Sequence, residues 1–174
     1  MFEFMKKKQV LDASERLERE RAAKADCCAI INESPILKLL QSKFNVQAGL
    51  YGILSTPYDD DYHTIAKVLK IVSEKLKNFE AANELLKLDS KITCIRVKAS
   101  ELEETVRNEI KVYVLNTPVE KITNEWITNK NKELEDALKQ TDEKVKCIIE
   151  IMNHIVAEKI SPIVADAMRT AYAS

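Results

Sequence analysis

Glycine is nearly absent from this chain, which holds two glycines, Gly49 and Gly52, in 174 residues. Average usage would place roughly a dozen glycines in a chain of this length. Glycine supplies the tight turns and positive φ angles that most phosphate-binding and nucleophile loops need. The sequence therefore excludes a glycine-rich phosphate loop, a dinucleotide-binding turn and a nucleophile elbow.

Groups for metal binding and acid–base catalysis are also scarce. The chain has two histidines and four cysteines, and the cysteines form no C-x-x-C pair. This spacing indicates neither a zinc ribbon nor a disulfide framework, and no cofactor is predicted. We expect the cysteines to be small buried residues. One of the adjacent pair Cys27 and Cys28 is the exception, because neighbours on a helix point about 100° apart.

Long apolar runs and an excess of one charge are missing as well. No apolar stretch approaches the roughly 18 residues that suggest a membrane-spanning helix. The net charge is −1, so no global field attracts the chain to nucleic acid or to an anionic membrane. We expect a cytoplasmic protein that has neither a membrane nor a nucleic acid as its partner.

The chain does contain clear helix-start signals. All four prolines follow Ser or Thr, and a hydroxyl cap before proline favours a helix start because the cap accepts an orphan N–H and proline has none. A capping box at residues 117–120 coincides with one of these proline signals, and a second box at residues 100–103 adds a fifth helix start. Residues 92–97 alternate like a strand and are predicted as a connector. Helices are predicted over residues 5–31, 35–43, 46–54, 57–78, 79–88, 101–115, 118–139, 142–160 and 162–172.

The predicted fold class is all-α, a single-domain bundle of about seven to nine helices. Residues 34–174 form the bundle domain, and residues 1–33 form a long charged helix partly outside it. This N-terminal helix carries opposite charges four residues apart, such as Arg16 and Glu20, but few apolar residues. Residues 57–78 space their apolar side chains as a packed seam. Residues 142–160 spread theirs over about half of the helix circumference, which predicts that this helix is central or is buried in a partner.

Three surfaces are predicted to bind another protein or a second copy of this chain. Helical faces commonly dock on partners, and acidic residues at a helix start suit a basic partner surface. The surfaces are Leu17 and Arg21 on the N-terminal helix, Asp59, Asp60 and Asp61 at a helix start, and Ile163, Val164, Met168 and Tyr172 near the C-terminal end.

By elimination, we expect a non-enzymatic protein–protein interaction protein that acts as an adaptor, an inhibitor or an assembly component. Self-association into a homo-oligomer belongs to the same hypothesis. The lysine-heavy basic set, with many isoleucines and asparagines, hints at an AT-rich genome, such as that of a phage or a low-GC bacterium.

Carboxylates supply an alternative function. Glu101 with Glu104, and Glu133 with Asp136, resemble the E-x-x-E and E-x-x-D magnesium-binding pairs of all-α nucleotide pyrophosphohydrolases. The resemblance implies a small metal-dependent nucleotide hydrolase, although Glu104 points about 160° away from the apolar face of its helix.

A second group of metal ligands follows one helix face. Glu150, His154 and Glu158 are spaced four residues apart, which aligns them in a stripe that suits a divalent ion or a set of ion pairs.

Charged residues also fall on apolar helix faces. Glu109 lies on the apolar face of residues 101–115, and Lys130 and Glu133 follow Trp126 along a second apolar stripe. Burying an unpaired charge is costly. These residues therefore mark either a seam edge, where long side chains reach solvent, or a face that meets a second subunit.

The basic residues of the N-terminal helix supply a second alternative, a regulator that contacts nucleic acid. Interleaved glutamates cancel most of their field, and no aromatic platform lies beside them. The basic residues are Lys6, Lys7, Lys8, Arg16, Arg19, Arg21 and Lys24.

Overall fold

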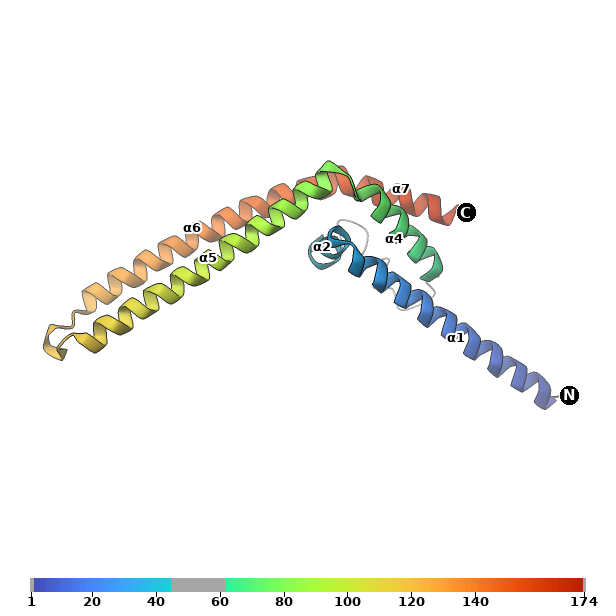
Figure 1. Cartoon of the computed structure of the whole chain (residues 1–174), viewed down its shortest axis with the longest axis horizontal. Helices are drawn as coiled ribbons and strands as arrows, with labels where there is room; N and C mark the ends of the chain where they lie inside the picture. Colours follow the sequence, from blue (N-terminus) through green and yellow to red (C-terminus); the bar gives the residue numbers. More distant parts are fainter. Residues whose placement is uncertain (1, 45–61, 174) are drawn as a thin grey trace. The chain divides into compact units, whose positions relative to one another are not determined.

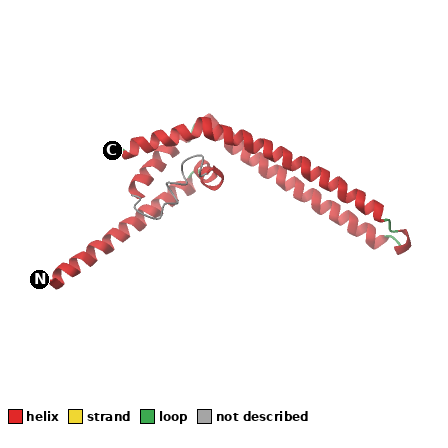
Figure 2. Cartoon of the chain, turned by 180° about the vertical axis from the view of Figure 1, so that it is seen from behind, coloured by secondary structure: helices red, strands yellow, loops and turns green. Residues whose placement is uncertain are grey.

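The computed structural model describes the backbone of residues 2–44 and 62–173, with side chains from residue 14 onward. All regular structure in these residues is helical (Figure 2), which confirms the all-α prediction for the described part of the chain. The predicted helix over residues 46–54 and the predicted helix start at residue 57 lie outside the described residues. The elements are α1 (Phe2–Glu33), α2 (Pro35–Phe44), α4 (Tyr62–Leu76), α5 (Glu80–Asn116), the 3₁₀ turn η1 (Val119–Lys121), α6 (Asn124–Ile155), the π-helical turn η2 (Val156–Ile160) and α7 (Ser161–Tyr172) (Figure 1).

The number of helices is smaller than predicted. Because α6, η2 and α7 follow one another without a break, the described residues form five helical rods instead of seven to nine. The expected boundaries near residues 88–101 and 139–142 are wrong, since α5 and α6 run through them. Neither stretch contains a glycine or a proline to interrupt the backbone hydrogen bonds. The predicted connector at residues 92–97 is helical, and Ile92 within it is buried.

The helix-start signals differ in their outcomes. Ser34 caps α2 as predicted, since the Leu37 N–H donates to Ser34 Oγ over 3.4 Å and the helix begins at Pro35. Residues 117–118, in contrast, lead into the short 3₁₀ turn η1, and α6 begins only at Asn124. The capping box there forms no side-chain cap hydrogen bond at Pro118. A cap signal therefore begins a helix only where the following residues also have a face to bury.

The helix-start signal at Ser161 and Pro162 lies inside the continuous helical run formed by α6, η2 and α7. The π-helical turn η2 directly precedes it. Pro162 has no N–H to donate to the carbonyl of Glu158, four residues earlier. A π turn shifts the hydrogen-bond pattern from i→i+4 to i→i+5, which carries the helix past this gap.

The chain divides into two compact units. Unit 1 comprises residues 1–86 and 153–174, and unit 2 comprises residues 87–152. The boundaries fall within α5 and within α6.

The core of unit 1 forms around α4, which packs against both α1 and α7. The predicted seam is confirmed at Ile65, Leu69, Val72 and Leu76 of α4, which are buried, whereas Tyr62 at the start of α4 is half-buried. Among the side chains of α1 that the structure describes, those from Ala23 onward contribute to this core, whereas residues 14–22 are exposed on every side. The buried residues are Ile65, Leu69, Val72 and Leu76 of α4, Ala23, Cys27 and Ile31 of α1, Leu37 and Leu40 of α2, and Val164, Ala167 and Ala171 of α7.

The four cysteines differ in environment. Cys27 is buried, and its Sγ donates a hydrogen bond to the Tyr62 carbonyl oxygen over 3.5 Å. Burial raises the pKa of the Cys27 thiol, with smaller contributions from Cys28 and Asp26. The exposure of Cys28 confirms the prediction for the adjacent pair. The expectation of burial is wrong for Cys94 and Cys147, which are exposed because they lie off the seam of their helices.

Unit 2 is a helical hairpin. Its parts of α5 and α6 run side by side and antiparallel (Figures 1 and 2). Its buried residues are Ile92 and Val106 of α5 and Val145, Ile148 and Met152 of α6. They are spaced by threes and fours or their sums, as in a coiled-coil seam.

The prediction of a central helix at residues 142–160 is corrected by this hairpin. Ile149 and Ile151 are exposed, because one neighbouring helix in unit 2 covers one face of α6 and leaves the other to solvent.

Candidate functional site

The turn of the unit 2 hairpin carries four exposed apolar residues, which we call the tip patch: Val112, Val114, Leu115 and Val119. They are 41–82% exposed. The first three end α5, and Val119 lies in η1. Because successive helical residues point about 100° apart, an apolar run over residues 112–115 cannot all face one seam. This apolar run is the signal in the sequence that points to the tip patch.

A stacked aromatic pair joins the two helices beside the tip patch. The Tyr113 and Trp126 ring centroids lie 4.1 Å apart with an interplanar angle of 28°. The Tyr113 hydroxyl also reaches the turn, where it accepts from the Thr123 N–H over 3.3 Å and lies 3.5 Å from the Lys121 carbonyl oxygen. Thr123 Oγ1 lies 3.4 Å from the same hydroxyl, and these contacts with Thr123 lower the pKa of Tyr113. The aromatic pair thereby fixes the turn.

The charges on the apolar faces pair with one another. Lys130 Nζ on α6 lies 3.2 Å from Glu109 Oε2 on α5 and 3.6 Å from Glu133 Oε2. It also lies 6.0 Å from the Trp126 ring centroid, at the limit of a cation–π contact. The hydrogen bond with Glu109 contributes most to raising the pKa of Lys130. Lys130, Glu109 and Glu133 thus form the edge of a seam inside the hairpin.

An open groove follows the aromatic pair, with a volume of about 620 Å³. Val112 is the one residue of the tip patch that forms part of its wall. The lining residues are Thr105, Asn108, Glu109, Val112, Tyr113, Trp126 and Lys130.

The predicted partner-binding residues have mixed exposure. Leu17, Arg21 and Tyr172 are exposed, and Ile163 and Met168 are half-buried. Val164 is 1% exposed; its inclusion in a partner surface is therefore corrected, because α7 packs that face against α4. Asp59, Asp60 and Asp61 lie outside the described residues.

The acidic candidates do not converge on an ion. Glu150, His154 and Glu158 are all exposed, and Glu158 lies in the π-helical turn η2, which disturbs the four-residue spacing. Glu101, Glu104, Glu133 and Asp136 are exposed too. Among the residues that the structure describes, no three His, Cys, Asp or Glu side chains gather closely enough to hold a metal.

Two further findings complete the description. Across residues 2–44 and 62–173, no helix combines the length and the apolar character needed to span a bilayer. Neither a protein-family model, nor a curated protein, nor a solved structure matches this chain.

Proposed function

We propose that this chain is a non-enzymatic helical protein that binds other proteins, or a second copy of itself, as an adaptor, an inhibitor or an assembly component. The tip patch is the observation that carries this proposal. A group of exposed apolar side chains on a soluble helical surface marks a protein contact, because its burial is favourable only when a partner covers it.

The surroundings of the tip patch favour the same proposal. The stacked Tyr113 and Trp126 rings are rigid and amphipathic, and aromatic residues are enriched at the energetic centres of interfaces. The hydroxyl contacts of Tyr113 with the turn hold the patch in one conformation before a partner arrives. A preordered surface loses less conformational entropy on binding than a flexible one does.

Leu17, Arg21 and Tyr172 form a second part of the proposal, as contact residues on unit 1. All three are exposed. Leu17 and Arg21 lie one helical turn apart on the stretch of α1 that packs against nothing described, so a partner helix can contact both.

The tip patch is tested with the double variant Leu115→Lys and Val119→Lys. We expect it to abolish capture of proteins from the native host's lysate, or to reduce the molar mass measured by light scattering if the partner is a second copy. Charged side chains at the centre of an apolar contact are strongly unfavourable once buried.

Val97→Lys is the matched control, because Val97 is 51% exposed on the same helix but lies outside the tip patch. It should behave as wild type. If the double variant retains both the captured proteins and the molar mass of wild type, the tip patch is not the contact surface. The variants Leu17→Lys and Arg21→Glu apply the same test to α1.

A further inference from the structure

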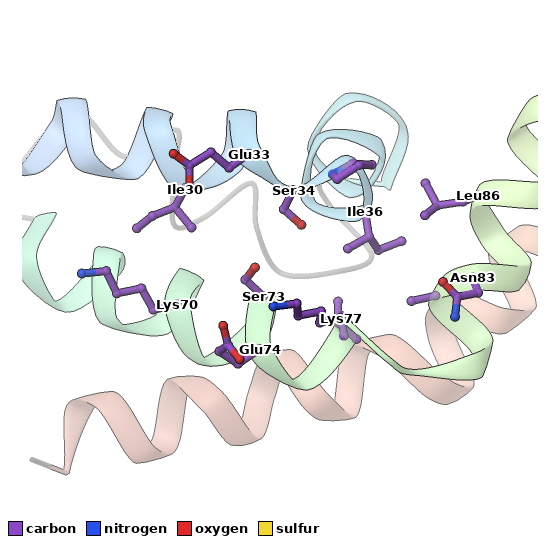
Figure 3. A pocket seen from close by; sticks show the side chains of 13 residues that line it. Ile30, Glu33, Ser34, Ile36, Lys70, Ser73, Glu74, Lys77, Asn83 and Leu86 are labelled. Atoms are coloured by element: carbon purple, nitrogen blue, oxygen red, sulfur yellow. The ribbon is translucent and has the colours of Figure 1, made fainter.

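Unit 1 contains a cleft with a volume of about 740 Å³ (Figure 3). It lies between the end of α1, the start of α2, the second half of α4 and the first turns of α5. Ser34 and Ser73 face one another across it in Figure 3, from the α1–α2 junction and from α4. The volume is within the range of roughly 300–1,000 Å³ that ligand sites occupy.

The cleft has an apolar floor. Ile36, Leu76 and Ala82 are buried there, and Ile30 and Leu86 are half-buried with part of their surface open to the cleft. These residues come from four different helices of unit 1, so the floor is shaped by packing that the core of the unit already holds in place. An apolar side chain of a ligand can therefore be buried here without rearranging the helices.

The rim of the cleft is charged. It carries Lys70 and Glu74 from α4, Lys77 from the turn directly after α4, and Glu33 from the end of α1. All four are exposed. An apolar centre inside a polar rim is the usual anatomy of a surface that recognises a protein segment.

The rim charges have no partner among the residues that the structure describes: their side chains form no ion pair or hydrogen bond. Unit 1 does form ion pairs elsewhere, since Lys75 on the same helix pairs with Asp166. Two positive and two negative groups are therefore available around one apolar floor, and they complement a ligand that carries both charges.

The spacing of the lysines limits the size of that ligand. Lys77 directly follows α4, and its N–H donates to the Ser73 carbonyl oxygen in the helical pattern. Lys70 and Lys77 are therefore about two turns, or about 10 Å, apart along the helix axis. A ligand that reaches both must span about three residues of extended chain, at roughly 3.3 Å each. A single free amino acid reaches one of the two lysines at most.

We propose that this cleft binds a short peptide segment of a partner protein, in which an apolar residue is flanked by an acidic and a basic residue. The apolar side chain packs on Ile36 and Leu76, the acidic side chain pairs with Lys70 or Lys77, and the basic side chain pairs with Glu33 or Glu74. This inference does not rest on the tip patch, which belongs to the other unit.

The probe is a displayed library of random twelve-residue peptides, selected on the full chain. We expect the enriched peptides to share an apolar residue next to Asp or Glu. Synthetic copies should bind the double variant Lys70→Glu and Lys77→Glu at least tenfold more weakly than wild type. Replacing the acidic residue of the peptide by Lys should restore binding to that variant, because the charges are then complementary again.

Lys67→Glu is the matched control, because Lys67 is an exposed lysine of α4 that does not line the cleft. It should bind the peptides as wild type does, and circular dichroism should show equal helix content in all variants. The proposal is overturned if no peptide is enriched, if the double variant binds as wild type does, or if the reversed peptide fails to bind it. Leu115→Lys with Val119→Lys should leave peptide binding intact, so failure here and failure of the tip patch are distinguishable.

Discussion

Lys75 Nζ lies 2.5 Å from Asp166 Oδ2, and this ion pair joins α4 to α7 within unit 1. Arg169 lies on the other side of the same carboxylate, at 3.7 Å. The hydrogen bond from Lys75, followed by its charge, lowers the pKa of Asp166. Both side chains are about half exposed, so solvent screens the pair and its contribution to stability is modest.

This pair predicts a pH-dependent difference in stability. A carboxyl group with a lowered pKa stabilises the folded state above its unfolded pKa, and this is lost as the pH falls through the folded value. We expect Lys75→Met to melt at a lower temperature than wild type at neutral pH. The difference in melting temperature between the two proteins should shrink as the pH falls below 3.8, the ordinary pKa of aspartate. Thermal melts monitored by circular dichroism measure this difference, and Lys70→Met is the control. A difference that does not change with pH would contradict the prediction.

The seam of α4 should dominate the stability of unit 1. Leu69 is fully buried between helices, so Leu69→Ala should lower the free energy of unfolding by about 2–5 kcal/mol. Ile151→Ala should cost under about 1 kcal/mol because Ile151 is largely exposed. Urea unfolding compares the two variants, and equal costs would show that this core is not packed as described.

The two helix-associated prolines should respond in opposite directions. Pro162→Ala supplies the missing N–H inside the α6–α7 run, and we expect a gain of about 1 kcal/mol, less than the full penalty of an internal proline because η2 already absorbs part of it. Pro35→Ala at the start of α2 should cost about 0.4–1 kcal/mol, since proline there restricts the unfolded chain without strain. Thermal melts test both, and a loss of stability in Pro162→Ala would refute the role given to η2.

Thiol labelling should separate the cysteines. Cys28, Cys94 and Cys147 are exposed, whereas Cys27 is buried with a raised pKa. We expect a maleimide to modify three thiols rapidly in the native protein and the fourth only on unfolding, because the thiolate is the reactive form. Mass spectrometry of digested fragments identifies the sites. Rapid native labelling of Cys27 would contradict the packing of α1 on α4.

The Tyr113 hydroxyl should protect the hairpin turn. Tyr113→Phe keeps the ring stack and removes the contacts with Lys121 and Thr123. We expect faster limited proteolysis within residues 117–123, because the turn then opens more often. Tyr172→Phe, at an exposed site, is the control. Unchanged cleavage in Tyr113→Phe would show that the turn is held by other contacts.

Several features of this fold could be predicted from local sequence. The cap at Ser34 and the seam through Leu69 each depend on residues within one or two helical turns, so periodicity and capping rules are sufficient to find them. The helix boundaries near residues 88–101 could not be found in this way. A capping box and a strand-like alternation argued for a break, but burial of Ile92 in the hairpin overrides both local preferences.

The candidate surfaces were predictable only in part. Exposure of Leu17 and Arg21 follows from the charged, apolar-poor sequence around them. The apolar run over residues 112–115 is the local signal for the tip patch. The pairing of Lys130 with Glu109 and the cleft beside Lys77, in contrast, join residues whose proximity depends on how helices meet. No rule based on spacing along one helix predicts which residue of a second helix lies opposite.

By itself, the sequence determined that the described chain is built of helices and which face of α4 is buried, because the near absence of glycine and the three- and four-residue spacing of apolar side chains act within single elements. Tertiary structure alone decided where the long helices end, which charges pair and which apolar residues stay uncovered. These outcomes depend on contacts between distant segments, whose free energy exceeds the weak local preferences at each boundary.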